Sequence, residues 1–209
     1  MIAEIYHKNI SYLEDELTGN FFGTMRYMPF DRGLRRIFSN YVVSDDAQVK
    51  DIILNACDEE FDIEFWKRSD NGLVEIDIYI PLSNAGIGIE VKYQSGLSGD
   101  NQLEKEAKFF SEECCKGKDK ILLFIARDED AKKIYEQNKD KEIFTEVHLA
   151  YISWQDILLG LDEIIVTSSY EKKMVEDLKQ LLIEKGFIAF DGFECELPVV
   201  KEELFYEFR

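Results

Sequence analysis

The chain has 209 residues, of which 45% are hydrophobic and 13% aromatic, and its formal net charge at pH 7 is −18. This composition excludes an intrinsically disordered chain, and no stretch approaches the ~20 apolar residues of a membrane-spanning helix. A chain of this length is expected to form one domain, residues 1–209. Because the N-terminus also lacks the pattern of a signal peptide, we expect a soluble cytoplasmic protein with no membrane contact.

Turn signals and the spacing of apolar residues predict a mixed α/β chain. A helix is expected to start at Ser11, where Glu14 completes a capping box. Further helices are predicted at 46–60, 101–115, 128–140, 154–161 and 168–186, and strands at 61–68, 73–80, 87–93, 120–126 and 146–153, with another strand or two within 187–209. Asn71-Gly72 favours a hairpin between the first two strands. The order predicts a mixed sheet with helices on its faces, not an all-parallel doubly wound fold.

The arginine-rich segment 25–38 is the one locally basic stretch. It carries Arg26, Arg32, Arg35 and Arg36 against a single aspartate, with aromatic residues interleaved. A strongly acidic chain is repelled by polyanions, which counts against a sequence-independent nucleic-acid binder. The segment therefore has two interpretations, a basic groove or an amphipathic helix with solvated arginines, and the second is the simpler.

The cysteines do not suggest a metal site. Cys57, Cys114, Cys115 and Cys195 form no CxxC pair, and neither histidine lies at ligand spacing from them. Reduced thiols are the expectation.

Charged residues interrupt two of the predicted strands in "EIDIYIPLSNAGIGIEVKY", residues 75–93. Strand side chains alternate between faces, so Ile76, Ile78 and Ile80 share one face with Ile87, Ile89 and Val91 of the neighbouring strand. Asp77, Glu90 and Lys92 then converge on the opposite face. Two carboxylates a strand apart suit a hard divalent cation, and a nearby lysine can orient a water or stabilise charge on a phosphate. The simpler alternative is a solvated sheet face with a Glu–Lys pair.

These residues resemble the PD-(D/E)XK nuclease superfamily. Asp77 followed by Glu90-Val91-Lys92, on a hairpin before a helix and a buried strand, looks like its central motif. "EDELT" (14–18) resembles the E-N-x-L-T segment of many prokaryotic members, and "NQLEKE" (101–106) resembles their Q-L-x-x-Y segment. The resemblance implies a restriction-endonuclease-like α-β-β-β-α-β core over residues 11–126, with an α/β extension over 140–209 outside it.

The chain departs from that pattern at two positions. Ile76 stands where a proline usually precedes the aspartate, and Glu106 stands where a tyrosine is expected, which weakens the argument for the usual role of that helix. Glu14 has two interpretations, an acid near the metals or only a helix cap after Ser11.

What the resemblance implies is a Mg²⁺-dependent endodeoxyribonuclease of the restriction or defence type, in which Mn²⁺ substitutes for Mg²⁺. Asp77, Glu90 and the Val91 carbonyl would hold the metal and Glu14 a second metal or its waters. Lys92 would orient or activate the water, and Gln102 would position Lys92 or the scissile phosphate. DNA is the expected substrate, with a homodimer and a protein partner that supplies DNA affinity as further partners. The alternatives are a catalytically silent binding protein on the same fold and an acidic decoy that mimics DNA.

Overall fold

The computed structural model describes residues 13–59, 61–93 and 101–188. Five strands form one open sheet in the order β1 (Glu64–Arg68), β2 (Glu75–Pro81), β3 (Ala85–Val91), β4 (Asp119–Ala126) and β5 (His148–Ser153). Strands β1, β2 and β3 run antiparallel, and β4 and β5 then run parallel to β3. The prediction of a mixed α/β sheet is confirmed.

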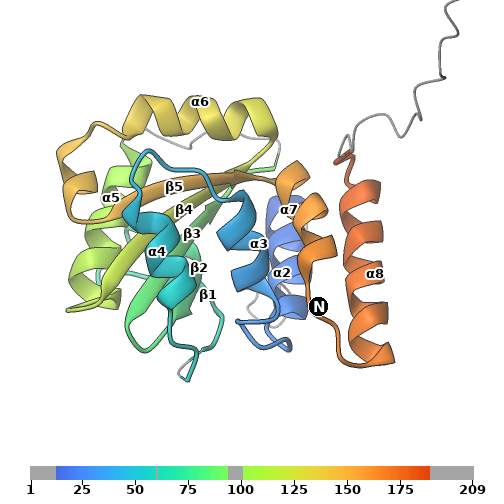
Figure 1. Ribbon diagram of the computed structural model, residues 1–209. Coiled ribbons are helices and arrows are strands. Elements are labelled where there is room, and N and C mark those ends of the chain that lie inside the picture. The colour runs from blue at the N-terminus through green and yellow to red at the C-terminus, as the bar shows by residue number, and fades with distance from the viewer. Residues whose placement is uncertain (1–12, 60, 94–100, 189–209) are drawn as a thin grey trace, which may run out of the picture.

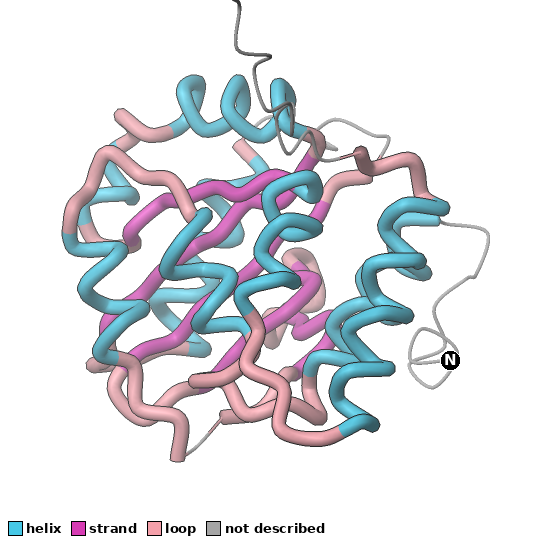
Figure 2. The backbone as a smooth tube through the Cα atoms, turned by 45° about the vertical axis from the view of Figure 1, so that its right-hand side comes forward, coloured by secondary structure: helices cyan, strands magenta, loops and turns pink. Residues whose placement is uncertain are grey.

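Helices cover both faces of the sheet (Figures 1 and 2). The helices are α2 (Leu13–Met25), α3 (Leu34–Tyr41), α4 (Gln48–Asn55), α5 (Gln102–Phe109), α6 (Asp128–Asn138), α7 (Trp154–Gly160) and α8 (Ser169–Glu184), with short helical turns η1 (Phe110–Cys114), η2 (Glu142–Thr145) and η3 (Leu161–Glu163). One apolar core joins the sheet to α2, α3, α4, α7 and α8, and a second joins the opposite face to α5 and α6. The molecule is therefore a three-layer sandwich.

The observed elements differ from the predicted ones mainly at the N-terminal side. Helix α3 overlaps only the end of the arginine-rich segment 25–38, for which an amphipathic helix was the simpler interpretation, and continues beyond it to Tyr41. Helix α4 is shorter than the predicted 46–60, and α5 ends at Phe109, where the chain continues as a π-helical turn. The Ser11 cap, Cys195 and nearly all of the strands predicted within 187–209 lie outside the described residues.

The predicted placement of Ile76 is wrong. Ile78 and Ile80 join the first core, but Ile76 packs in the second core with Tyr79. Simple alternation also fails in the neighbouring strand, where Phe65 and Trp66 are adjacent yet both belong to the first core. Trp66 has a φ of 47°, which interrupts the extended backbone of β1 between the paired positions on β2.

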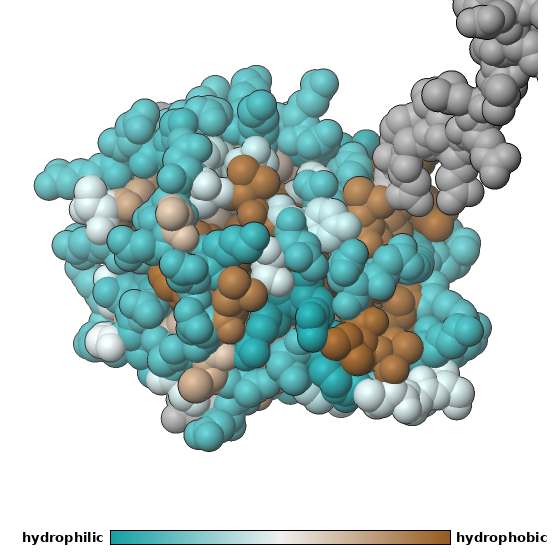
Figure 3. Space-filling view, viewed as in Figure 1, coloured by the Kyte–Doolittle hydropathy of each residue, from teal (hydrophilic) through white to brown (hydrophobic). Residues whose placement is uncertain are grey.

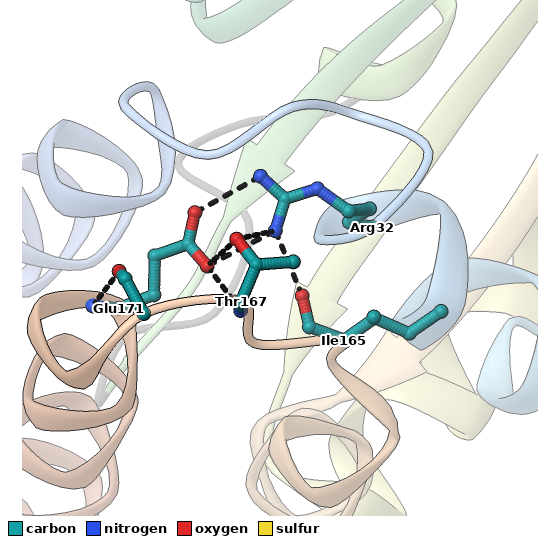
Figure 4. A network of polar contacts seen from close by, with 5 residues as sticks. Arg32, Ile165, Thr167 and Glu171 are labelled. Atoms are coloured by element: carbon teal, nitrogen blue, oxygen red, sulfur yellow. Dashed lines mark hydrogen bonds and ion pairs between the residues drawn. The ribbon is translucent and has the colours of Figure 1, made fainter.

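Helix α8 begins and ends as the sequence predicts. The Ser168 side chain accepts a hydrogen bond from the backbone N–H of Glu171, and Gly186 follows the helix with a φ of 84°. Ser168 and Glu171 have the spacing of a capping box, but the Glu171 carboxylate instead binds Arg32, a residue 139 positions earlier in the chain (Figure 4). This contact ties α8 to the segment before α3.

The arginine-rich segment serves the fold. Arg32 also donates to the Ile165 carbonyl and the Thr167 hydroxyl, Arg26 pairs with Asp62, and Arg35 donates to the Ala56 carbonyl. These three arginines are therefore bonded within the fold, which matches neither a free basic groove nor solvated arginines, and the segment is a loop followed by α3 rather than one helix.

The face seen in Figure 3 is mostly hydrophilic, in keeping with the net charge of −18. None of the helices in the part of the chain that the structure describes has the length and apolar composition of a membrane span.

Candidate active site

Four secondary-structure elements contribute side chains to one polar cluster beside the C-terminal end of the interior strand β3. Asp77 lies in the middle of β2, Glu90 near the end of β3, and Lys92 directly after β3. Glu14 comes from the first turn of α2, and Gln102 is the first residue of α5. The structure thus brings together all five side chains that the sequence singles out.

Lys92 is the centre of the cluster. Its Nζ lies 2.7 Å from Glu90 Oε1 and 3.1 Å from Glu14 Oε1. Lys92 is 7% exposed and Glu90 is 2% exposed, so this ion pair is buried and the ammonium cannot be solvated by bulk water. The alternative of a solvated Glu–Lys pair on an open sheet face is therefore wrong for these two residues.

Backbone groups fix the other two acids. Asp77 Oδ2 accepts a hydrogen bond of 2.9 Å from the Val91 N–H, which joins β2 to the last residue of β3. Glu14 Oε2 accepts one of 2.9 Å from the Tyr93 N–H, so each Glu14 oxygen contacts the segment after β3. Glu14 belongs to the cluster.

Glu106 is a further member of the cluster that sequence reasoning did not assign to it. The Gln102 side-chain amide donates to Glu90 Oε1 at 2.6 Å and to Glu106 Oε1 at 2.7 Å. Glu106 is 2% exposed, and its Oε2 has no hydrogen-bond partner among the described residues. The available signal was its position four residues after Gln102, which puts both side chains on one face of α5.

The pKa values of the acids are raised. Burial and repulsion from the neighbouring Glu106 together raise the pKa of Glu90 to about 8, although Lys92 opposes the shift. Burial raises the pKa of Glu106 to about 7, although the Gln102 amide opposes the shift. Burial, followed by repulsion from Glu90, also raises the pKa of Asp77 well above its ordinary value. The carboxyl groups in this cluster outnumber the cationic groups, so each carboxyl group holds its proton more tightly than it would in water.

Lys92 shifts in the sense that keeps it charged. Burial favours the neutral amine, but attraction to the carboxylates of Glu90 and Asp77 outweighs burial and raises the pKa of Lys92. An ammonium donates hydrogen bonds and accepts none. In this arrangement Lys92 can stabilise negative charge, and it is not available as a base.

The donor set fits a hard divalent cation by its chemistry. The cluster offers carboxylate oxygens with excess negative charge, and the unpartnered Glu106 Oε2 has unused lone pairs. Within residues 13–59, 61–93 and 101–188, however, no group of three or more His, Cys, Asp or Glu side chains is arranged to hold a metal ion. The Lys92 ammonium lies between Glu14 and Glu90, and the Gln102 amide lies between Glu90 and Glu106.

Aromatic residues support the cluster from the side of β4 and α7. The Trp154 indole N–H donates to the Lys92 carbonyl at 3.3 Å, and Trp154 stacks on Phe187. Arg127, directly after β4, lies over the rings of Tyr93 and Phe187 at 5.7 and 5.4 Å from their centroids. Since β3 and β4 are parallel, Arg127 and Lys92 follow the same ends of adjacent strands. A cation is thus held beside the acidic cluster.

A groove of about 560 Å³ lies elsewhere, between α2 and α8, and is lined by Gly19, Gly23, Tyr170 and Leu178 among others. None of the clustered acids lines it. Comparison of the chain with models of protein families, with curated proteins and with solved structures finds no match in any of the three.

Proposed function

We propose that the chain is a metal-dependent nuclease that hydrolyses phosphodiester bonds in DNA. The single observation that carries the proposal is the buried Lys92 ammonium, held between the carboxylates of Glu90 and Glu14 beside Asp77. Burying ionised groups costs several kcal/mol each before pairing, so a fold gains little from such a cluster unless the cluster has a function.

The order of elements supports the same proposal. The sequence α2, β1, β2, β3, α5, β4 corresponds to the α-β-β-β-α-β order of the PD-(D/E)XK superfamily, which the motif around Asp77 and Glu90 resembles. Helices α3 and α4 would be insertions between the first helix and the first strand. We therefore propose the restriction-endonuclease-like fold for the core.

Asp77, Glu90 and the Val91 carbonyl would hold Mg²⁺ or Mn²⁺, with Glu14 as a further acid nearby. The bound cation would lower the pKa of a water molecule and offset charge on the phosphate. Because Lys92 stays an ammonium, its role would be to donate a hydrogen bond to that water or to a phosphate oxygen as negative charge develops. Glu90 and Glu14 hold Lys92 in position for this.

Arg127 supplies a contact that an acidic protein needs. Its guanidinium is stacked on Tyr93 and Phe187, and within the described part of the chain it forms no ion pair. A guanidinium suits phosphate oxygens, and aromatic packing reduces the entropy lost when it binds. We assign it to a backbone phosphate of the substrate.

The test is metal-dependent cleavage of supercoiled plasmid, linear DNA and single-stranded DNA, with Mg²⁺, Mn²⁺ or EDTA. Wild type would run beside Asp77→Asn and Lys92→Met, and beside their exposed counterparts Asp177→Asn and Lys173→Met on α8 as matched controls. We expect cleavage by wild type and both controls, none with EDTA, and none by Asp77→Asn or Lys92→Met.

Two results would favour the alternatives. Metal binding that Asp77→Asn abolishes, without cleavage by wild type, would indicate a catalytically silent protein on this fold. Neither metal binding nor cleavage, together with salt-dependent binding to basic proteins, would favour the acidic decoy.

A further inference from the structure

The Gln102 amide connects two buried carboxyl groups. Its Nε2 lies 2.6 Å from Glu90 Oε1 and 2.7 Å from Glu106 Oε1, so both of its hydrogens have an acceptor. Glu90 Oε1 also accepts from Lys92, at 2.7 Å. The orientation of the Glu90 carboxylate therefore depends on Gln102, and the orientation of Gln102 depends on Glu106.

Packing alone gives no reason for an acid at position 106. Its neighbours on α5, Leu103, Ala107 and Phe109, are buried apolar residues of the second core. Glu106 is 2% exposed, and its Oε2 has no hydrogen-bond partner among the described residues, an arrangement that destabilises the folded protein. An apolar side chain would avoid this cost, so the reason for an acid lies in the polar contacts that it makes, with the Gln102 amide through Oε1 and with the Glu90 carboxyl group.

We propose that Glu106 is a positioning residue, which holds the Gln102 amide against Glu90 and so fixes the Glu90 carboxylate for a divalent cation. The inference rests on the proposed nuclease function, because only there is Glu90 a metal ligand. Ligating carboxylates depend on the hydrogen bonds that they receive, and loss of such a partner typically weakens metal binding about 10- to 100-fold.

The experiment measures Mn²⁺ affinity by titration calorimetry, with plasmid cleavage as a second readout. Glu106→Met keeps the shape and removes the acceptor, whereas Glu106→Gln keeps an acceptor oxygen for Gln102. We expect Glu106→Met and Gln102→Met each to weaken Mn²⁺ binding about 10- to 100-fold. We expect Glu106→Gln to recover most of that affinity, and the double methionine variant to be no weaker than either single variant.

Glu104→Gln is the matched control. Glu104 lies on the same helix but pairs with Lys141 outside the cluster, so its loss should leave Mn²⁺ affinity unchanged. Thermal melts check that every variant folds. Where Glu106→Met does not fold, Gln102→Met tests the same bridge from a partly exposed position, and Glu106→Gln tests it from the other end.

Three outcomes would overturn this inference alone, and a fourth would overturn the proposed function as well. Equal losses in Glu106→Gln and Glu106→Met would mean that the charge of Glu106 itself is used, as in a direct ligand. Additive losses in the double variant would mean that the two residues act independently. Unchanged Mn²⁺ affinity in both methionine variants, with a wild type that binds Mn²⁺, would refute the inference alone. A wild type that binds no Mn²⁺ would refute the proposed function together with the inference.

Discussion

Two charged clusters connect distant parts of this chain, and they treat charge in opposite ways. In the cluster of Figure 4, Arg32 meets the Glu171 carboxylate through two hydrogen bonds of 2.9 and 3.0 Å, and Thr167 donates to the same carboxylate. Cation and anion are matched there, and the pKa of Glu171 falls to about 2. Around Lys92 the carboxyl groups outnumber the cation, and the pKa of Glu90 rises to about 8.

The Arg32–Glu171 contact therefore stabilises the fold, whereas the cluster around Lys92 contains repulsion that the rest of the fold has to offset. The matched pair needs nothing from outside, because each charge has its partner. The carboxyl groups around Lys92 lower their mutual repulsion by keeping protons, and a divalent cation would lower it further.

Lys92→Met should reduce DNA cleavage at least about 100-fold, because it removes the group that faces developing negative charge. Mn²⁺ binding should persist, since the carboxylates remain. Arg32→Met should leave cleavage unchanged, because Arg32 belongs to the matched cluster. The measurement is single-turnover plasmid cleavage with calorimetric titration of Mn²⁺. A folded Lys92→Met protein that cleaves at the wild-type rate would refute the assignment.

The sequence predicts which residues of the candidate site lie together better than it predicts which face of the sheet the neighbouring apolar residues occupy. Alternation on two strands was enough to bring Asp77, Glu90 and Lys92 together, because strand pairing is local. The same rule fails for Ile76, where the unusual backbone of Trp66 on the neighbouring strand accompanies a break in the alternation. No local pattern marks such a break.

Contacts between distant residues lay beyond any local pattern. The pairing of Arg32 with Glu171 depends on how α8 packs against α2 and α7. The sequence around either residue gives no indication of its partner. Glu106 read as a departure from a motif, and only its placement four residues after Gln102 indicated a shared helix face. The homodimer, the protein partner and the cytoplasmic location stay predictions.

Arg127→Met should weaken DNA binding without changing which sequences bind. Arg127 differs from Arg32 in that it lies over two aromatic rings and forms no ion pair within the described ranges. Losing one phosphate contact should reduce the slope of log affinity against log salt by about 0.9. Binding would be measured in EDTA, which prevents cleavage, with Arg68→Met as the control because Arg68 is exposed and paired with Glu75. An unchanged salt slope would remove Arg127 from the proposed DNA contact.

In EDTA, Glu90→Gln should melt at a higher temperature than wild type, and the difference between the two melting temperatures should grow as pH increases. The raised pKa of Glu90 means that the folded protein binds a proton that the unfolded chain has lost. The stability conferred by that proton is complete below the ordinary pKa of 4.5 and is lost as pH rises through about 8. Glutamine cannot ionise and escapes the loss. Melting curves from about pH 5 to pH 8 check this, and a difference that is constant with pH would contradict it.

Glu171→Gln should have the smallest effect and the opposite sign. The hydrogen bond from Arg32 lowers the pKa of Glu171 to about 2, so the stability of this contact is present above pH 4.5 and is lost as pH falls toward 2. The variant should melt a few degrees below wild type at neutral pH, and the gap should close in acid. Asp177→Asn, which breaks the exposed pair with Lys173, is the control and should change little. Because this contact holds α8 to the segment before α3, a gap that persists unchanged in acid would mean that packing, and not the charge of Glu171, secures α8.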